Sequence, residues 1–115
     1  MFWVALWSSL GCIAQSGASL DQARGLAVRQ VTEHGLKSLD ITREQRDMMT
    51  RCMRSTQEVG AGPSSPDPLY EPYLIEVQMP SGSMTFELYT PSHLKGNKGK
   101  NYRNGCMYDL LRSVN

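Results

Sequence analysis

Histidine is scarce in this chain, and the scarcity excludes much of the chemistry that a small protein can carry. The 115 residues include only His34 and His93, and neither lies at metal-ligand spacing from a second histidine or from a cysteine pair. A cysteine–histidine nucleophile could be built only from Cys106 and His93. We therefore expect no bound metal, no cofactor and no catalytic residues, and a non-enzymatic function.

Long apolar runs and Asn-x-Ser/Thr glycosylation acceptors are absent as well. The one apolar candidate runs from Phe2 to Ala14, and it is shorter than the about 20 residues that a membrane-spanning helix needs. We expect no transmembrane segment in the mature chain. No nucleic-acid-binding motif is present either, so nucleic acid is not an expected partner.

The opening stretch has the features of a secretory signal peptide. An uncharged apolar segment is followed by small residues, and signal peptidase could cut after Ala14 or after Ala18, although no Lys or Arg precedes the segment. Two other interpretations stay open. One is a buried N-terminal element of a cytosolic domain, and the other is a lipoprotein that carries lipid on Cys12. We expect residues 1–18 to be a signal peptide and the protein to be secreted.

Cysteine is also rare, and the number of cysteines in the mature chain depends on whether the signal peptide is cleaved. Removal of Cys12 with the signal peptide leaves Cys52 and Cys106, which can form one disulfide in an oxidising compartment. The bridge would close a loop of about 55 residues and stabilise the fold by about 4 kcal/mol on the chain-entropy model. Residues 19–115 are then expected to form a single small domain.

Two capping boxes predict a pair of helices in the first half of the mature chain. Ser19-Leu20-Asp21-Gln22 would open the first helix, with Gly35 ending it, and Thr42-Arg43-Glu44-Gln45 would open the second, which runs to Gly60. In the first helix the apolar residues at helical spacing are Leu20, Ala23, Ala27 and Val31. The short connection between the two predicts a helical hairpin.

Alternation of apolar and polar residues predicts a β-hairpin after a Pro/Gly linker at 60–72. Tyr73 to Met79 and Met84 to Tyr89 alternate around a turn at Pro80-Ser81-Gly82-Ser83. A two-stranded hairpin is marginal alone, so its apolar face should pack on the helices. A short helix is expected after Cys106. The predicted fold class is therefore α+β, an N-terminal helical hairpin packed on a β-hairpin with a short C-terminal helix.

Charge is unevenly distributed along the second half of the chain. Segment 61–92 contains no basic residue, whereas the tail from His93 is basic apart from Asp109. Lys95, Lys98, Lys100 and Arg103 lie in a Gly/Asn-rich loop with no acid between them, and they are candidate anion-binding residues for a polyanion. The alternative is a solvated loop that balances the acidic hairpin.

Methionine is abundant, with Met48, Met49 and Met53 on neighbouring turns of the second predicted helix. Flexible thioethers fill irregular cores and also suit adaptable binding surfaces. Together these features favour a small secreted binding or structural protein with one disulfide, whose partner is an unidentified extracellular protein or a polyanion.

Residues 82–89, Pro91 and the segment Lys100-Asn101-Tyr102-Arg103 with Cys106 resemble the opening strands and first helix of cyclophilin-type prolyl isomerases. The resemblance covers about a third of the chain, and the spacing from Pro91 to Asn101 is longer than in that family. The Phe-His-Arg segment of its catalytic core has no counterpart here. The resemblance implies a truncated or degenerate member without the isomerase site.

Gln57-Glu58-Val59-Gly60-Ala61 resembles the Gln-x-Val-x-Gly motif of cystatins, with Ala61 in place of the last glycine. Together with the leader and the long helix, this resemblance implies a cystatin-like secreted inhibitor. It would require residues 57–61 to form a hairpin turn.

Overall fold

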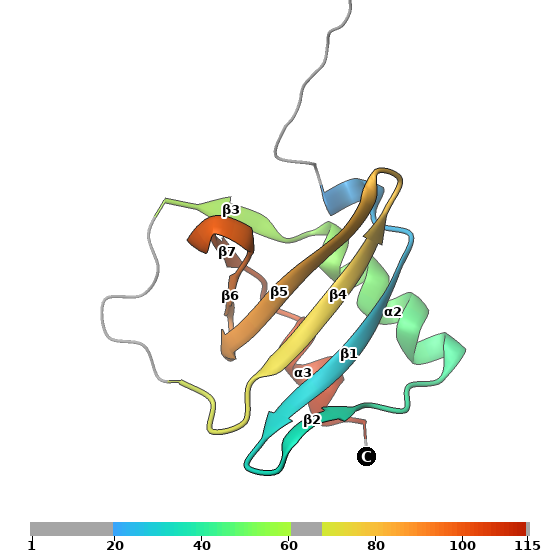
Figure 1. Ribbon diagram of the computed structural model, residues 1–115. Helices are drawn as coiled ribbons and strands as arrows, with labels where there is room; N and C mark the ends of the chain where they lie inside the picture. The colour runs from blue at the N-terminus through green and yellow to red at the C-terminus, as the bar shows by residue number, and fades with distance from the viewer. Residues whose placement is uncertain (1–19, 61–67, 115) are drawn as a thin grey trace, which may run out of the picture.

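The described part of the chain is built on an antiparallel sheet of seven strands, in the order β2-β1-β4-β5-β6-β7-β3 (Figure 1). The computed structural model describes residues 20–60 and 68–114. Their elements are η3 (Leu20–Gln22), β1 (Gly25–Thr32), β2 (Gly35–Ser38), α2 (Arg43–Arg54), β3 (Gln57–Val59), β4 (Tyr73–Met79), β5 (Gly82–Thr90), β6 (His93–Lys95), η4 (Asn97–Gly99), β7 (Asn101–Arg103) and α3 (Met107–Arg112).

The predicted helical hairpin is wrong, because the segment assigned to its first helix forms η3 and strand β1, and the connection expected after Gly35 forms strand β2. Leu26 and Val28 are buried while Ala27 between them is exposed, which is the period of a strand. β1 pairs with β4 on one side and β2 on the other. Gly35, expected to end a helix, instead lies at the β1–β2 turn with φ 113°, a conformation that glycine adopts without strain.

The helix predicted from Thr42 is confirmed as α2, and it ends earlier than expected. The Thr42 hydroxyl accepts from the Gln45 amide at 3.1 Å, and the Gln45 side chain accepts from the Thr42 amide at 2.8 Å. The helix stops at Arg54 rather than continuing to Gly60. Residues Gln57–Val59 then form edge strand β3, because their backbone pairs with β7.

The β-hairpin predicted from alternation is confirmed as β4 and β5. Tyr73, Ile75, Val77 and Met79 are buried along β4. Met79 pairs with Gly82, so Pro80 and Ser81 form a two-residue loop. Gly82 has φ 136°, which only glycine adopts readily.

The basic segment predicted as a loop is a second, shorter hairpin made by β6, η4 and β7. Leu94 and Tyr102 face each other across the two strands and are buried. The register of β5 shifts between Leu88 and Thr90 where it meets β6, and such irregularities bend a sheet. In Figure 1 the strands beyond β5 accordingly turn away from the plane of β1, β4 and β5.

Helices α2 and α3 cover the same face of the sheet (Figure 1), and the hydrophobic core lies between the helices and the sheet. The buried side chains come from every layer, and the largest of those that are fully buried are Phe86, Met49, Met53, Ile75, Leu88, Leu94, Met107, Leu111 and Val77. The predicted C-terminal helix is confirmed as α3. Helix and strand are mixed, but the predicted fold class, an N-terminal helical hairpin packed on a β-hairpin, is wrong, because the described residues form mostly a seven-stranded antiparallel sheet with α2 and the short α3 against it.

Two predicted segments fall largely outside the described residues. The signal peptide at 1–18 lies entirely outside, and the linker at 60–72 lies partly outside. The described C-terminal end of the linker, residues 68–72, is hydrogen-bonded to the sheet. The Leu69 amide donates to the Tyr89 carbonyl, and the Val31 amide donates to the Pro72 carbonyl, both at 2.8 Å. Among the described residues, no helix combines the length and apolar character needed to cross a membrane.

Candidate functional site

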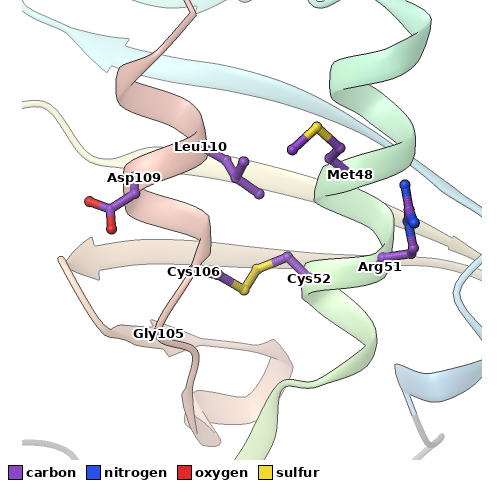
Figure 2. Close-up of a pocket in the computed structure, with 7 residues that line it drawn as sticks. All are labelled: Met48, Arg51, Cys52, Gly105, Cys106, Asp109 and Leu110. Carbon is purple, nitrogen blue, oxygen red and sulfur yellow. A yellow bond between two sulfur atoms is a disulfide. The ribbon is translucent and has the colours of Figure 1, made fainter.

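An open groove lies between α2 and α3, directly over the disulfide (Figure 2). Its volume is about 590 Å³, and its lining is mainly apolar. The residues that line it are Met48, Arg51, Cys52, Gly105, Cys106, Asp109 and Leu110. A groove of this size can take a few side chains of a bound partner.

The disulfide predicted between Cys52 and Cys106 is present and forms the floor of the groove. The two Cα atoms are 6.1 Å apart, within the range that disulfide geometry allows. Cys52 lies on α2 and Cys106 immediately precedes α3. The bridge therefore holds the two walls of the groove at a constant separation.

Asn104 supports the floor from beneath, and its side chain is only 2% exposed. Its Oδ1 accepts from the backbone amides of Cys106 and Met107 at 2.9 and 2.8 Å. Its Nδ2 donates to the Cys52 carbonyl at 3.1 Å and to the Thr56 hydroxyl at 2.9 Å. One buried side-chain amide thus supplies hydrogen-bond partners for backbone N–H groups at the start of α3 and for a backbone carbonyl near the end of α2.

Met48 is the most prominent apolar side chain of the groove, with 45% of its surface exposed. Met49 and Met53 on the same helix are buried in the core. Figure 2 shows Met48 and Leu110 directed toward each other above the disulfide. The methionine-rich helix therefore contributes both to the core and to a surface, which are the two uses that its composition suggested.

Charged residues flank the groove on opposite sides. Arg51 extends from the α2 side and Asp109 from the α3 side, and both point away from the centre (Figure 2). The ion pairs between described residues are His34–Glu33 and Lys100–Glu58, so neither flanking charge is paired within the described part of the chain. The groove is therefore apolar in the middle with one charge of each sign at its sides.

The predicted anion-binding residues lie on the β6–β7 hairpin, where acidic neighbours offset part of their charge. Lys95 pairs in register with Glu87, and its ammonium lies 5.1 Å from the centre of the Tyr89 ring. Lys100 Nζ is 3.9 Å from a carboxylate oxygen of Glu58. Arg103 on β7 is exposed, and the backbone of Lys98 lies in η4. Their anion-binding role stays a prediction.

Cys106 and His93, the residues considered for nucleophilic chemistry, are both bonded to other groups. Cys106 is in the disulfide, so it offers no thiol. His93 Nδ1 is 3.1 Å from the hydroxyls of both Thr90 and Ser92. Within residues 20–60 and 68–114, no group of three or more His, Cys, Asp or Glu side chains is arranged to hold a metal ion.

Sequence reasoning missed the groove and the role of Asn104. The partners of the Asn104 amide nitrogen are the Thr56 hydroxyl just beyond α2 and the Cys52 carbonyl on α2, which lie 48 and 52 residues away in sequence. A local sequence pattern cannot predict a contact between residues so far apart in the chain. The groove exists only because the chain returns α3 to the side of α2.

No family model, no curated protein and no solved structure matches this chain. Two local features also depart from the resemblances in the sequence. Residues 101–103 form strand β7 where the cyclophilin resemblance implied a helix. Residues 57–59 form edge strand β3 where the cystatin resemblance required a hairpin turn.

Proposed function

We propose that this chain is a secreted, non-enzymatic binding protein, and that the groove over the disulfide receives a peptide segment of a partner protein. The observation that carries the proposal is the groove itself, an open apolar surface between two cross-linked helices with Met48 at its edge. Exposed apolar surface with charged margins is typical of protein-interaction sites.

An extracellular location is supported by the disulfide and by the predicted signal peptide. Disulfides persist in oxidising compartments and are rare in the cytosol. The Cys52–Cys106 bridge joins the two helices that wall the groove, so an oxidising environment would also keep the binding surface rigid. A rigid surface loses less entropy when a partner binds.

The chemistry of the groove favours one class of occupant. A flexible thioether beside a disulfide can adapt to an apolar side chain, while Arg51 and Asp109 on opposite sides would each attract an opposite charge. We therefore expect the bound peptide to present one apolar side chain, with an acidic residue toward Arg51 and a basic residue toward Asp109.

Selection of binders from a random dodecapeptide library on the immobilised, oxidised protein tests the proposal. Enriched peptides should share the apolar residue flanked by opposite charges, and their binding should be saturable. Met48→Asp should weaken peptide binding at least about 10-fold, since it removes the apolar contact with the peptide and places a negative charge in the groove.

Leu36→Asp is the matched control, because Leu36 is also an exposed apolar residue, 54% exposed, and lies on β2 rather than at the groove. It should leave peptide affinity unchanged. Peptides that bind the Met48→Asp and Leu36→Asp variants equally well would contradict the proposed site, as would failure to enrich any saturable binder.

A further inference from the structure

A second hollow lies on the neighbouring face of α2, and arginine dominates it. Its volume is about 320 Å³, and its lining is mainly polar. The residues that line it are Arg24, Asp47, Thr50, Arg51 and Arg54. All but Arg24 come from α2, at positions that share one side of a helix. Arg24 comes from the segment between η3 and β1.

The charges of this arginine hollow are unbalanced. Three guanidinium groups line it together with the single carboxylate of Asp47. The two ion pairs found between described residues involve neither these arginines nor Asp47. Most of the guanidinium donors therefore face the hollow or solvent without an acidic partner in the described part of the chain.

The arginine hollow is also held in shape by hydrogen bonds beneath it. Arg54 Nε donates to the Ala23 carbonyl at 3.0 Å, and the Arg24 amide donates to the Gln78 carbonyl at 2.8 Å. Ala23 itself is buried. Thr50 is buried as well, and its hydroxyl donates to the Arg46 carbonyl at 2.7 Å. The backbone that carries these arginines is thus fixed in place before any ligand arrives.

Stabilisation of the helix end accounts for only part of this arrangement. Arg51 and Arg54 lie in the last turn of α2, where positive charge interacts favourably with the helix dipole. Arg24 lies between η3 and β1, so the dipole of α2 does not explain its place beside Arg51 and Arg54. Its presence adds repulsion between like charges, which a bound anion would relieve.

We propose that the arginine hollow binds a tetrahedral oxyanion, the phosphate or sulfate group of a larger ligand. Guanidinium groups donate parallel pairs of hydrogen bonds that match the oxygens of such anions. The Asp47 carboxylate can accept from a hydroxyl group next to the anion. The proposal is independent of peptide binding in the groove, although Arg51 borders both hollows.

Titration of the oxidised, ¹⁵N-labelled protein with sodium phosphate and with sodium sulfate tests the proposal, with sodium chloride at equal ionic strength as reference. Amide signals of residues 24, 47, 50, 51 and 54 should shift saturably with phosphate or sulfate and not with chloride. O-phosphoserine and a sulfated disaccharide then distinguish a phosphorylated from a sulfated source, because the true ligand class should bind more tightly than its free anion.

Arg24→Gln is the decisive variant, because it leaves the groove and the Arg54–Ala23 bond untouched. It should weaken anion binding at least about 10-fold, the loss expected for a charge-assisted hydrogen bond. Arg43→Gln, on α2 but outside the arginine hollow, removes one positive charge as well and should leave anion binding unchanged. Equal affinity of these two variants, or equal shifts with chloride, would overturn the proposal.

Discussion

Gly96 occupies a position where the backbone passes directly over two aromatic rings of the core. A Cβ atom at this position would lie 2.8 Å from Tyr102 Cε1 and 3.3 Å from Phe86 Cε2. The two rings meet edge to face with centroids 5.2 Å apart. Because both rings are buried, neither can move aside without disturbing its neighbours.

Gly96→Ala is therefore expected to destabilise the protein by about 1–3 kcal/mol, the usual cost of overpacking a core. Urea denaturation of the oxidised protein measures this change. Gly105→Ala is the control, since an added Cβ would meet nothing within 4 Å there, and its stability should match the parent. Equal midpoints for the two variants would mean that the β6–β7 hairpin adapts freely.

Tyr73 and Tyr102 are expected to limit stability at high pH. Burial raises the pKa of Tyr73, with further increases from Tyr108 and Glu71 that Arg112 opposes. Burial and the Glu58 carboxylate raise the pKa of Tyr102. The folded state thus retains phenol protons that the unfolded chain loses above its tyrosine pKa of about 10, so stability should be constant below that pH and fall above it.

Ultraviolet titration of phenolate formation, followed together with urea midpoints from pH 8 upward, checks this expectation. Stability that stays unchanged while Tyr73 and Tyr102 lose their phenol protons would show that these two groups do not control the alkaline limit.

The pairing of α2 with α3 depends on the disulfide and on Asn104 between them. α3 has only six residues, too few for a stable isolated helix. Its position follows from Cys106, which is bonded to α2, and from the packing of Met107 and Leu111 in the core. The groove therefore exists only while these links hold.

Removal of the bridge by the Cys52→Ala, Cys106→Ala double change should cost about 4 kcal/mol of stability, because the unfolded chain regains the entropy of a long loop. Urea denaturation measures this loss, while Ellman titration and intact mass establish that the parent has no free thiol at these positions. A double variant as stable as the parent would mean that core packing alone holds α3 in place.

The β6–β7 hairpin provides a separate test of the polyanion hypothesis. Changing Lys95, Lys98 and Lys100 to serine should lower the salt concentration that elutes the protein from heparin. Fewer cations attract the polyanion less strongly, so less salt is needed to screen the remaining attraction. A variant with Lys37, Arg43 and Arg112 changed to serine loses as many cations elsewhere. If both variants elute together, the hairpin is a solvated surface rather than a binding element.

The whole sheet ends in two short edges that limit association through its strands. β2 has four residues and β3 has three, and both carry exposed polar or charged side chains such as Lys37 and Glu58. Short, charged edges discourage pairing with other chains. The groove and the arginine hollow, for which binding is proposed, lie on the helical face instead.

Expression of the full chain in a secretory host tests its predicted route out of the cell. The uncharged apolar opening followed by Ala14 and Ala18 predicts a mature N-terminus at Gln15 or Ser19. N-terminal sequencing of protein from the medium measures the cleavage position directly. Exported or retained protein that still begins at Met1 would contradict a cleaved signal peptide.

Short-range patterns determined part of this fold from the sequence alone. The capping box at Thr42 depends on residues three apart, and the alternation from Tyr73 to Leu88 indicates which side chains face the core. Cysteine count, with the predicted loss of Cys12, identified the pair Cys52 and Cys106. Each of these inferences needs only neighbouring residues or the number of cysteines.

Tertiary structure alone decided the rest, because the deciding contacts join distant residues. Residues 25–32 have an apolar pattern compatible with a helix or a strand, and pairing with β4 nearly fifty residues away selects the strand. β6 and β7 are three residues long, too short for a periodicity to be recognised. The groove and the arginine hollow likewise combine α2 with segments far away in sequence, since a binding surface depends on which elements the folded chain places side by side.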